Sequence, residues 1–204
     1  MLIPRVSCPP DNAALNIDVA CCNWPEQYPD RPVVKAGICH CGDSIILDFD
    51  VLEEYTAAIV DHDNGDVWTD SCVEFFIAFD GDDGYYNLEA NCIGRVLLTH
   101  RLGKTEGVEP ASVAVLSSII RQPSLGTHPF EEKAGDNHWT LRLIVPATVF
   151  FRHDISSLSG LKAKCNFYKC GDNLSKPHFL SWRPVATETP DFHRPESFAD
   201  IEFE

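Results

Sequence analysis

Basic residues are scarce in this chain, since only 16 Lys and Arg stand against 31 Asp and Glu, and the formal net charge is -15. Such an acidic surface repels the phosphates of nucleic acids and the anionic headgroups of lipids, so neither is an expected partner. Long apolar runs are also missing, because none approaches the ~20 residues of a membrane-spanning helix. Pro4 and Pro10 interrupt the region where a secretory signal peptide would carry its apolar segment. The sequence therefore predicts neither a membrane protein nor a signal peptide.

The cysteines lack the pattern of a disulfide framework. There are nine, an odd number without a repeating spacing, in a chain of 204 residues that is too long for a small disulfide-stapled scaffold. We expect mostly reduced thiols packed in the interior, as Cys72 and Cys92 would be on predicted strands. Together with the missing signal peptide, this predicts a cytoplasmic protein.

Helical periodicity is weak throughout, whereas apolar and polar residues alternate in many segments, which is typical of strands with one buried face. Expected strands cover residues 45–51, 55–61, 67–79, 85–96, 112–121, 139–145, 161–169, 178–182 and 198–203, with a helical turn at 146–151 and an irregular crossing at 184–195. This content indicates an all-β fold, an antiparallel two-sheet β-sandwich of the jelly-roll or immunoglobulin-like type. No repeat or boundary divides the chain, so residues 1–204 are expected to form a single domain.

The clearest pattern is a predicted hairpin within residues 67–96, whose two arms flank the acidic turn GDDG at 81–84. A turn at these residues would place Asp80 opposite Tyr85 and Glu74 opposite Asn91. Because side chains alternate across a strand, that register puts the apolar residues of both arms on one side of the sheet. The opposite side then carries a row of polar and aromatic side chains: Trp68, Asp70, Glu74, Asn87, Glu89 and Asn91.

An indole beside carboxylates and amides is suited to binding a sugar. The C–H face of a pyranose ring packs on an aromatic plate, and its hydroxyl groups need paired hydrogen-bond acceptors and donors. Glu74 can accept from two hydroxyls, while Asn87 and Asn91 can both donate and accept. The alternative is that this face is only the solvated side of an antiparallel sheet, where polar residues are expected in any case.

Two motifs resemble the family 9 carbohydrate-binding modules. The first is WTDSCVEFFIAFD at 68–80, which keeps the family's six-residue step from tryptophan to glutamate. The second is LSW at 180–182, followed by the proline-containing segment PDFHRPESFADIEF at 190–203. The resemblance covers the chain from about Val34 to its C-terminus and is closer still to free-standing, family-9-like proteins. It implies a β-sandwich that binds carbohydrate without catalysis, as modules associated with polysaccharide breakdown do.

The resemblance also assigns individual positions. It matches the family's first clamp tryptophan with Trp68, its strand glutamate with Glu74, and an aspartate of the preceding strand with Asp61. The second clamp tryptophan corresponds to Phe192, which is a smaller plate. The family's hydroxyl-binding arginine aligns with Glu89, which exchanges a donor-only side chain for an acceptor-only one.

Other groups of residues have weaker signals. Asp61, Asp63 and Asp66, with Asn64, crowd one turn with oxygen ligands that could hold a structural Ca²⁺ ion, although their spacing is not that of an EF-hand. No cofactor is otherwise required. His178 and His193 are candidates for hydrogen bonding in a site or in the core. Residues 168–172 end a predicted strand, where a ligand loop could gather Tyr168, Lys169 and Asp172.

The leading hypothesis is non-catalytic binding of a mono- or oligosaccharide through Trp68, Phe192, Asp61, Glu74, Asn87, Glu89 and Asn91. One alternative is a glycoside hydrolase that uses Glu74 and Glu89, which would lie diagonally on adjacent strands. Two carboxylates on an open sheet face would lack the enclosure that raises the pKa of a general acid, which disfavours this alternative. Another alternative is a scaffold domain that has lost its sugar. In that case Trp68 should be packed under its neighbours, with no cavity between it and Phe192.

Overall fold

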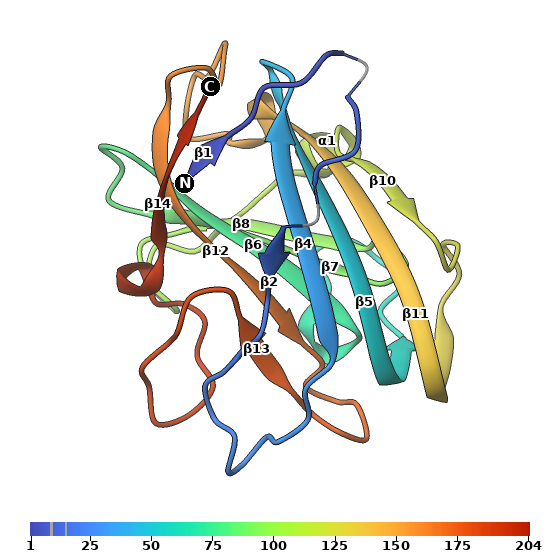
Figure 1. Ribbon diagram of the computed structural model, residues 1–204. Coiled ribbons are helices and arrows are strands. Elements are labelled where there is room, and N and C mark those ends of the chain that lie inside the picture. The colour runs from blue at the N-terminus through green and yellow to red at the C-terminus, as the bar shows by residue number, and fades with distance from the viewer. Residues whose placement is uncertain (9, 15) are drawn as a thin grey trace.

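Two β-sheets pack face to face in the computed structural model, which describes residues 1–8, 10–14 and 16–204, and their strands cross in Figure 1. One sheet has nine strands in the order β1-β14-β12-β6-β7-β8-β9, with β13 paired to β12 and β3 paired to β13. The other has five strands in the order β10-β11-β5-β4-β2. The all-β sandwich is therefore confirmed. The larger sheet is mixed rather than purely antiparallel, because β1 runs parallel to β14.

The strands of the larger sheet are β1 (Leu2–Ile3), β3 (Cys21–Cys22), β6 (Cys72–Phe79), β7 (Tyr85–Asn91), β8 (Val96–Arg101), β9 (Glu109–Pro110), β12 (Lys162–Cys170), β13 (Phe179–Ser181) and β14 (Ala199–Phe203). Those of the smaller sheet are β2 (Ile17–Asp18), β4 (Val33–His40), β5 (Ser44–Ala58), β10 (Ile120–Pro123) and β11 (Phe130–Pro146). One helix, α1 (Val113–Ser117), and 3₁₀ turns at Val67–Thr69, Ala147–Val149 and Pro195–Ser197 complete the described elements. No helix in the described part of the chain is long and apolar enough to cross a membrane.

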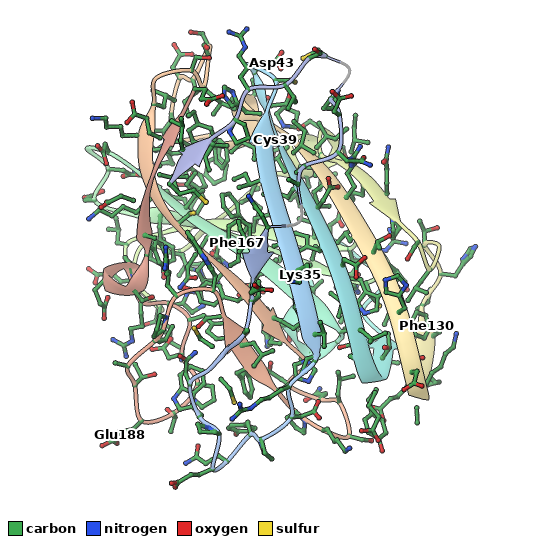
Figure 2. The ribbon with its side chains drawn as sticks, viewed as in Figure 1. Lys35, Cys39, Asp43, Phe130, Phe167 and Glu188 are labelled. Carbon is green, nitrogen blue, oxygen red and sulfur yellow. The ribbon has the colours of Figure 1, made fainter. Side chains whose placement is uncertain are left out.

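The main core forms between the sheets from the alternate apolar residues that the sequence pattern predicts. Phe167 of β12 lies between the two sheets in Figure 2, where it contacts Phe75 of β6 and Phe49 of β5, with ring centroids 5.0 and 6.2 Å apart. Trp139 and Leu141 of β11 are fully buried on the facing sheet. Burial of such side chains contributes roughly 1.5–3 kcal/mol each, so this interdigitated layer supplies most of the stabilisation.

Three predicted strands differ from the structure. Residues 45–51 and 55–61 belong largely to one strand, β5, because the charge that breaks the apolar pattern, Glu53, is buried on the core side and paired with Lys169 at 2.8 Å. Residues 112–121 form α1 and then β10 instead of one strand. The side chain of Ser112 accepts a hydrogen bond from Val115 N at 3.3 Å, which caps the helix. A short apolar run alone does not separate these two conformations.

The predicted register of the β6–β7 hairpin was wrong by two residues. Glu74 lies opposite Glu89, and Asn91 lies opposite Cys72. The loop starts earlier than expected because Asp82 N donates to Phe79 O at 3.1 Å, and Asp82 in turn contacts His100 Nε2 at 3.0 Å. An even shift leaves every side chain on its predicted face, so Glu74 and Asn91 still share one side of the sheet.

A second, smaller core covers the other face of the larger sheet. The irregular crossing at 184–194 and the segment after β3 lie over this face, as the sequence predicts for the crossing, and Figure 2 shows Glu188 at the outer edge of the crossing. Trp24 Nε1 donates to Thr187 O at 2.7 Å, and Val185 and Phe198 join the same apolar cluster. The polar row of the hairpin is therefore enclosed rather than solvated. This excludes the alternative that the row is only the solvent-exposed side of an antiparallel sheet.

Candidate functional site

A pocket of about 340 Å³ opens on the covered face of the larger sheet. Its lining combines three aromatic side chains with a majority of charged and polar ones. The apolar residues of the lining are Trp68, Phe179, Phe192 and Pro190, and the others are Glu74, Glu89, Arg101, Lys104, Thr105, Cys170, Asp172, Asp191 and His193. Four of the predicted binding residues line it together: Trp68, Glu74, Glu89 and Phe192.

Trp68 stands at the side of the pocket on a 3₁₀ turn, and not on the strand that the alternation predicts. The buried neighbour Val67 anchors this turn, while the indole itself remains half-buried. The backbone carbonyl of Trp68 accepts a hydrogen bond from Asp172 N at 3.2 Å and lies 3.5 Å from Cys170 Sγ. These contacts tie the indole to the end of β12, so its position relative to the carboxylates is fixed.

Glu74 and Glu89 face each other across β6 and β7 at the centre of the pocket face. Only 3% and 4% of their surfaces are exposed, which overturns the expectation of an open sheet face. Glu74 Oε1 accepts a hydrogen bond from Cys170 Sγ at 3.0 Å, and Glu89 Oε1 accepts one from Asn87 Nδ2 at 2.7 Å. Glu89 Oε2 is buried and has no hydrogen-bond partner among the described residues.

Enclosure shifts the titration of both carboxyls. Burial raises the pKa of Glu74 well above its usual range, and the negative charge of Glu89 adds to the shift. Burial also raises the pKa of Glu89 to about 7, against the opposing effects of the Asn87 amide and the Arg101 guanidinium. The two carboxyls face each other, so ionisation of one disfavours ionisation of the other.

Arg101 on β8 supplies a cationic group that the sequence prediction missed. Its Nε donates to Asn87 Oδ1 at 2.9 Å and to Thr99 Oγ1 at 2.7 Å, and its Nη1 donates to Lys104 O at 2.7 Å. Nη2 has no hydrogen bond to any described residue. Asn87 thus uses its oxygen and its amide within the protein, where it orients Arg101 and Glu89. Alternation along β8, with Arg101 opposite Tyr85, is the signal that places the guanidinium on this face.

Two other predicted binding residues lie away from the pocket lining. Asn91 Nδ2 donates to Val60 O at 3.0 Å and to Asp70 Oδ2 at 2.9 Å, and its Oδ1 accepts from Arg95 N at 2.8 Å. Asn91 is therefore committed to holding the loops at this end of the sheet. Asp61 is exposed and contacts its neighbour His62 Nδ1 at 3.1 Å.

The predicted calcium ligands do not converge. Asp63 Oδ1 instead accepts from Arg121 Nη1 at 2.6 Å and from Val96 N at 3.1 Å. Within residues 1–8, 10–14 and 16–204, the one group that places three potential ligand atoms within 4.8 Å of one another is Cys72, Glu74 and Cys170. Asp61, Asp63 and Asp66 are thus separate carboxylates in this structure.

Phe192 forms a packed wall of the pocket. One face of its ring stacks on Tyr168, with centroids 4.2 Å apart and an interplanar angle of 16°, and only 8% of the residue is exposed. His193 lies beside it, with Nδ1 2.9 Å from Tyr85 Oη. Burial lowers the pKa of His193 to about 4, so the ring is neutral at physiological pH.

Two further candidates, His178 and Lys169, lie outside the pocket lining. Lys169 points into the interior of the sandwich, since Tyr168 and Cys170 take the pocket side of β12. Its Nζ contacts Glu53 Oε2 at 2.8 Å and His178 Nε2 at 2.7 Å. These three side chains form a buried polar network in the core.

The geometry defines a class of protein, namely a β-sandwich with an aromatic and acidic pocket on the outer face of one sheet. Residues 11–203 match the family described as carbohydrate-binding family 9, so the chain belongs to that family. No curated protein matches the chain.

Solved structures share the fold of this chain. A candidate carbohydrate-binding protein from Bacteroides uniformis ATCC 8492 is 40% identical, with a TM-score of 0.93 over 100% of this chain and 98% of that one. A family 9 module from Caldicellulosiruptor kristjanssonii in complex with glucose is 9% identical, with a TM-score of 0.54 over 100% of this chain and 95% of that one. The complex of such a module with cellotriose has the same identity of 9%, a TM-score of 0.53 and coverages of 100% and 93%. At these identities the Caldicellulosiruptor structures show a shared fold.

Proposed function

We propose that this protein binds a mono- or oligosaccharide in the pocket between Trp68 and Phe192 without transforming it. The observation that carries the proposal is the half-buried indole beside an enclosed pair of carboxylates and a guanidinium. Membership of carbohydrate-binding family 9 supports it, as do the glucose and cellotriose complexes of modules with this fold. A pocket of about 340 Å³ is at the lower end of the range for small ligands, which favours one or two sugar rings.

Each group has a role that follows from its chemistry. The indole of Trp68 offers a plate for the C–H face of a pyranose ring. Glu74 and Glu89 accept hydrogen bonds from ring hydroxyl groups, and Arg101 donates one through Nη2. Asn87 positions Glu89 and Arg101 instead of contacting the sugar itself. We further propose that the protein acts in the cytoplasm, alongside enzymes that break down polysaccharides.

Isothermal titration calorimetry tests this function. Glucose, cellobiose and a panel of other mono- and disaccharides are titrated into the wild type, Trp68→Ala and the matched control Trp182→Ala. Trp182 is also half-buried but does not line the pocket. We expect binding heat in the wild type and the control, and its loss in Trp68→Ala. Equal heats in the wild type and Trp68→Ala would show that the sugar does not bind at this site. The absence of heat with any sugar would contradict the proposed function.

One observation favours a second candidate, a glycoside hydrolase. Glu74 and Glu89 are enclosed, and burial raises the pKa of both, which is the condition that a general acid requires. Turnover of aryl glycosides that disappears in Glu74→Gln would support catalysis. No turnover across a broad panel of α- and β-linked substrates would exclude it. The scaffold alternative is disfavoured, because Trp68 and Phe192 line the same cavity.

A further inference from the structure

Carboxyl groups outnumber cationic groups in the lining of the pocket. Glu74, Glu89 and Asp172 contribute three carboxyl groups, and none of them forms an ion pair with another described residue. The fourth carboxylate of the lining, Asp191, differs, because Lys104 Nζ lies at 3.4 Å and Arg194 Nη2 at 2.8 Å. An excess of acidic groups over cations in a partly enclosed cavity favours a ligand that brings a positive charge.

Glu89 shows where that charge would lie. The residue is 96% buried, since 4% of its surface is exposed, and its Oε2 has no hydrogen-bond partner among the residues that the structure describes. A buried acceptor without a partner is costly, so a ligand that donates to Oε2 gains more than it would in water. Glu74 stands directly opposite, so a single donor group can reach both carboxyls.

The one guanidinium of the lining does not remove this preference. Arg101 directs Nε to Asn87 and Thr99 and Nη1 to the Lys104 carbonyl, and no ion pair among the described residues joins it to Glu89. A hydroxyl group could satisfy Oε2 with one hydrogen bond but brings no charge to offset that of a carboxylate. An ammonium group donates up to three bonds and also supplies the opposite charge.

We propose that the pocket selects a sugar with a free, protonated amino group, that is, an unacetylated hexosamine, whose ammonium group lies between Glu89 and Glu74 while its ring packs on Trp68. This inference rests on the proposed sugar-binding function and names its ligand class. The Trp68 indole also favours a nearby cation through its ring face. N-acetylation removes the charge and is therefore expected to abolish the preference.

Proton release is a second consequence of this arrangement. The ammonium group favours the ionised form of both glutamates, so binding transfers their protons to the buffer. The groups that face the pair are Cys72 and Cys170 from β6 and β12, Arg101 from β8, and Asp66 and Asp172 from the loops. Affinity for the amine should increase as the pH rises from 6 towards the pKa of the amine itself. The proton count follows from titrations in buffers with different ionisation enthalpies.

The experiment compares D-glucosamine, N-acetyl-D-glucosamine, D-glucose and cyclohexylamine by calorimetry at pH 7. The variants are Glu89→Gln, Glu74→Gln and the control Glu196→Gln, since Glu196 is exposed on the 3₁₀ turn Pro195–Ser197 and lies outside the pocket lining. Thermal unfolding of each variant establishes that it is folded. We expect glucosamine to bind the wild type and the control at least tenfold more tightly than glucose, with proton release. In Glu89→Gln the ratio of the two affinities should approach one.

The outcomes separate the inference from the function on which it rests. Glucose binding as tightly as glucosamine, or an unchanged ratio in Glu89→Gln, would overturn the selection of an amine and leave sugar binding standing. If cyclohexylamine binds as tightly as glucosamine, the site binds amines in general, and the proposed selection of a hexosamine is overturned. Binding of none of the four compounds, while other sugars of the wider panel bind, overturns the inference alone. Binding of no sugar at all contradicts both.

Discussion

Replacement of Lys169 by methionine should destabilise the protein strongly, because it leaves a carboxylate buried without its partner. The side chains of Lys169 and Glu53 are 0% and 1% exposed, with Nζ 2.8 Å from Oε2. Glu53 Oε1 also accepts from Trp139 Nε1 at 2.7 Å and from Thr56 Oγ1 at 3.0 Å, so the carboxylate has no room to turn towards solvent. Removing one partner of a buried pair costs about 3–5 kcal/mol. For a chain of this size that lowers the Tm by roughly 6–20 °C.

Urea unfolding at pH 7, followed by circular dichroism, measures this cost. The matched control is Lys164→Met, the same substitution at an exposed position of β12, which should change the free energy of unfolding by less than about 0.5 kcal/mol. The double variant Glu53→Gln/Lys169→Met should recover about 1–3 kcal/mol, because the amide oxygen still accepts from Trp139 while no charge remains unpaired. If Lys169→Met unfolds at the same midpoint and slope as the control, the reasoning about this network is refuted.

The pH dependence of the same network has a defined sign. Burial acts to raise the pKa of Glu53, but the Lys169 ammonium group more than offsets it, so the pKa is lowered. Burial, together with Lys169, lowers the pKa of His178 from 6.5 to about 3. In both cases the unfolded chain binds the proton more readily, so wild-type stability should fall as the pH decreases from 6.5 towards 3. In Lys169→Met, burial alone raises the pKa of Glu53, so the deficit relative to wild type should shrink between pH 7 and pH 5.

Three further predictions concern the surroundings of the pocket and the thiols. Asn87→Ala removes the donor to Glu89 Oε1 and should raise the pKa of Glu89 above about 7, as measured by NMR titration of its carboxyl carbon. An unchanged pKa would contradict the hydrogen bond between Asn87 and Glu89. Asp82→Asn should cost about 1–3 kcal/mol at pH 7, because Asp82 is held by His100 at 3.0 Å, and the difference should vanish as the pH falls through the lowered pKa of Asp82. Under native conditions iodoacetamide should label the exposed Cys8 well before the buried cysteines, as followed by mass spectrometry over time. Labelling of the buried cysteines at the same rate as Cys8 would contradict their burial in the core.

The alternation within β6, β7 and β12 was sufficient to predict which side chains point inward. Phe75 and Phe167 lie in the core, and Glu74 and Glu89 lie on the opposite face, as the period of two requires. The register was predicted less well, because it depends on how Asp82 folds back onto His100 and not on the strands alone. The continuous strand β5 was missed for a similar reason, since the partner that lets Glu53 occupy a core position lies on a distant strand.

The residues that line the pocket were predicted where a local motif or the alternation of the hairpin carried them. Trp68 and Glu74, six residues apart in one motif, both line the pocket. Arg101 was missed because a lone arginine at the end of a strand gives no signal until the pairing of β7 with β8 places it on the same face. Asn91 was included because it shares that face, but its bonds to Asp70 and Val60 commit it to the loops.

The sequence by itself determined the two faces of each strand, the sandwich class and the family, because these depend on alternation and on motifs within a few residues of one another. Only the tertiary structure decided that the polar face is enclosed. That enclosure comes from the crossing at 184–194, which is held down by contacts such as Trp24 with Thr187 and Phe192 with Tyr168. The pairing of Glu74 with Glu89 becomes chemically distinctive only inside this cover, because exclusion of water is what raises their pKa values and leaves Oε2 without a partner.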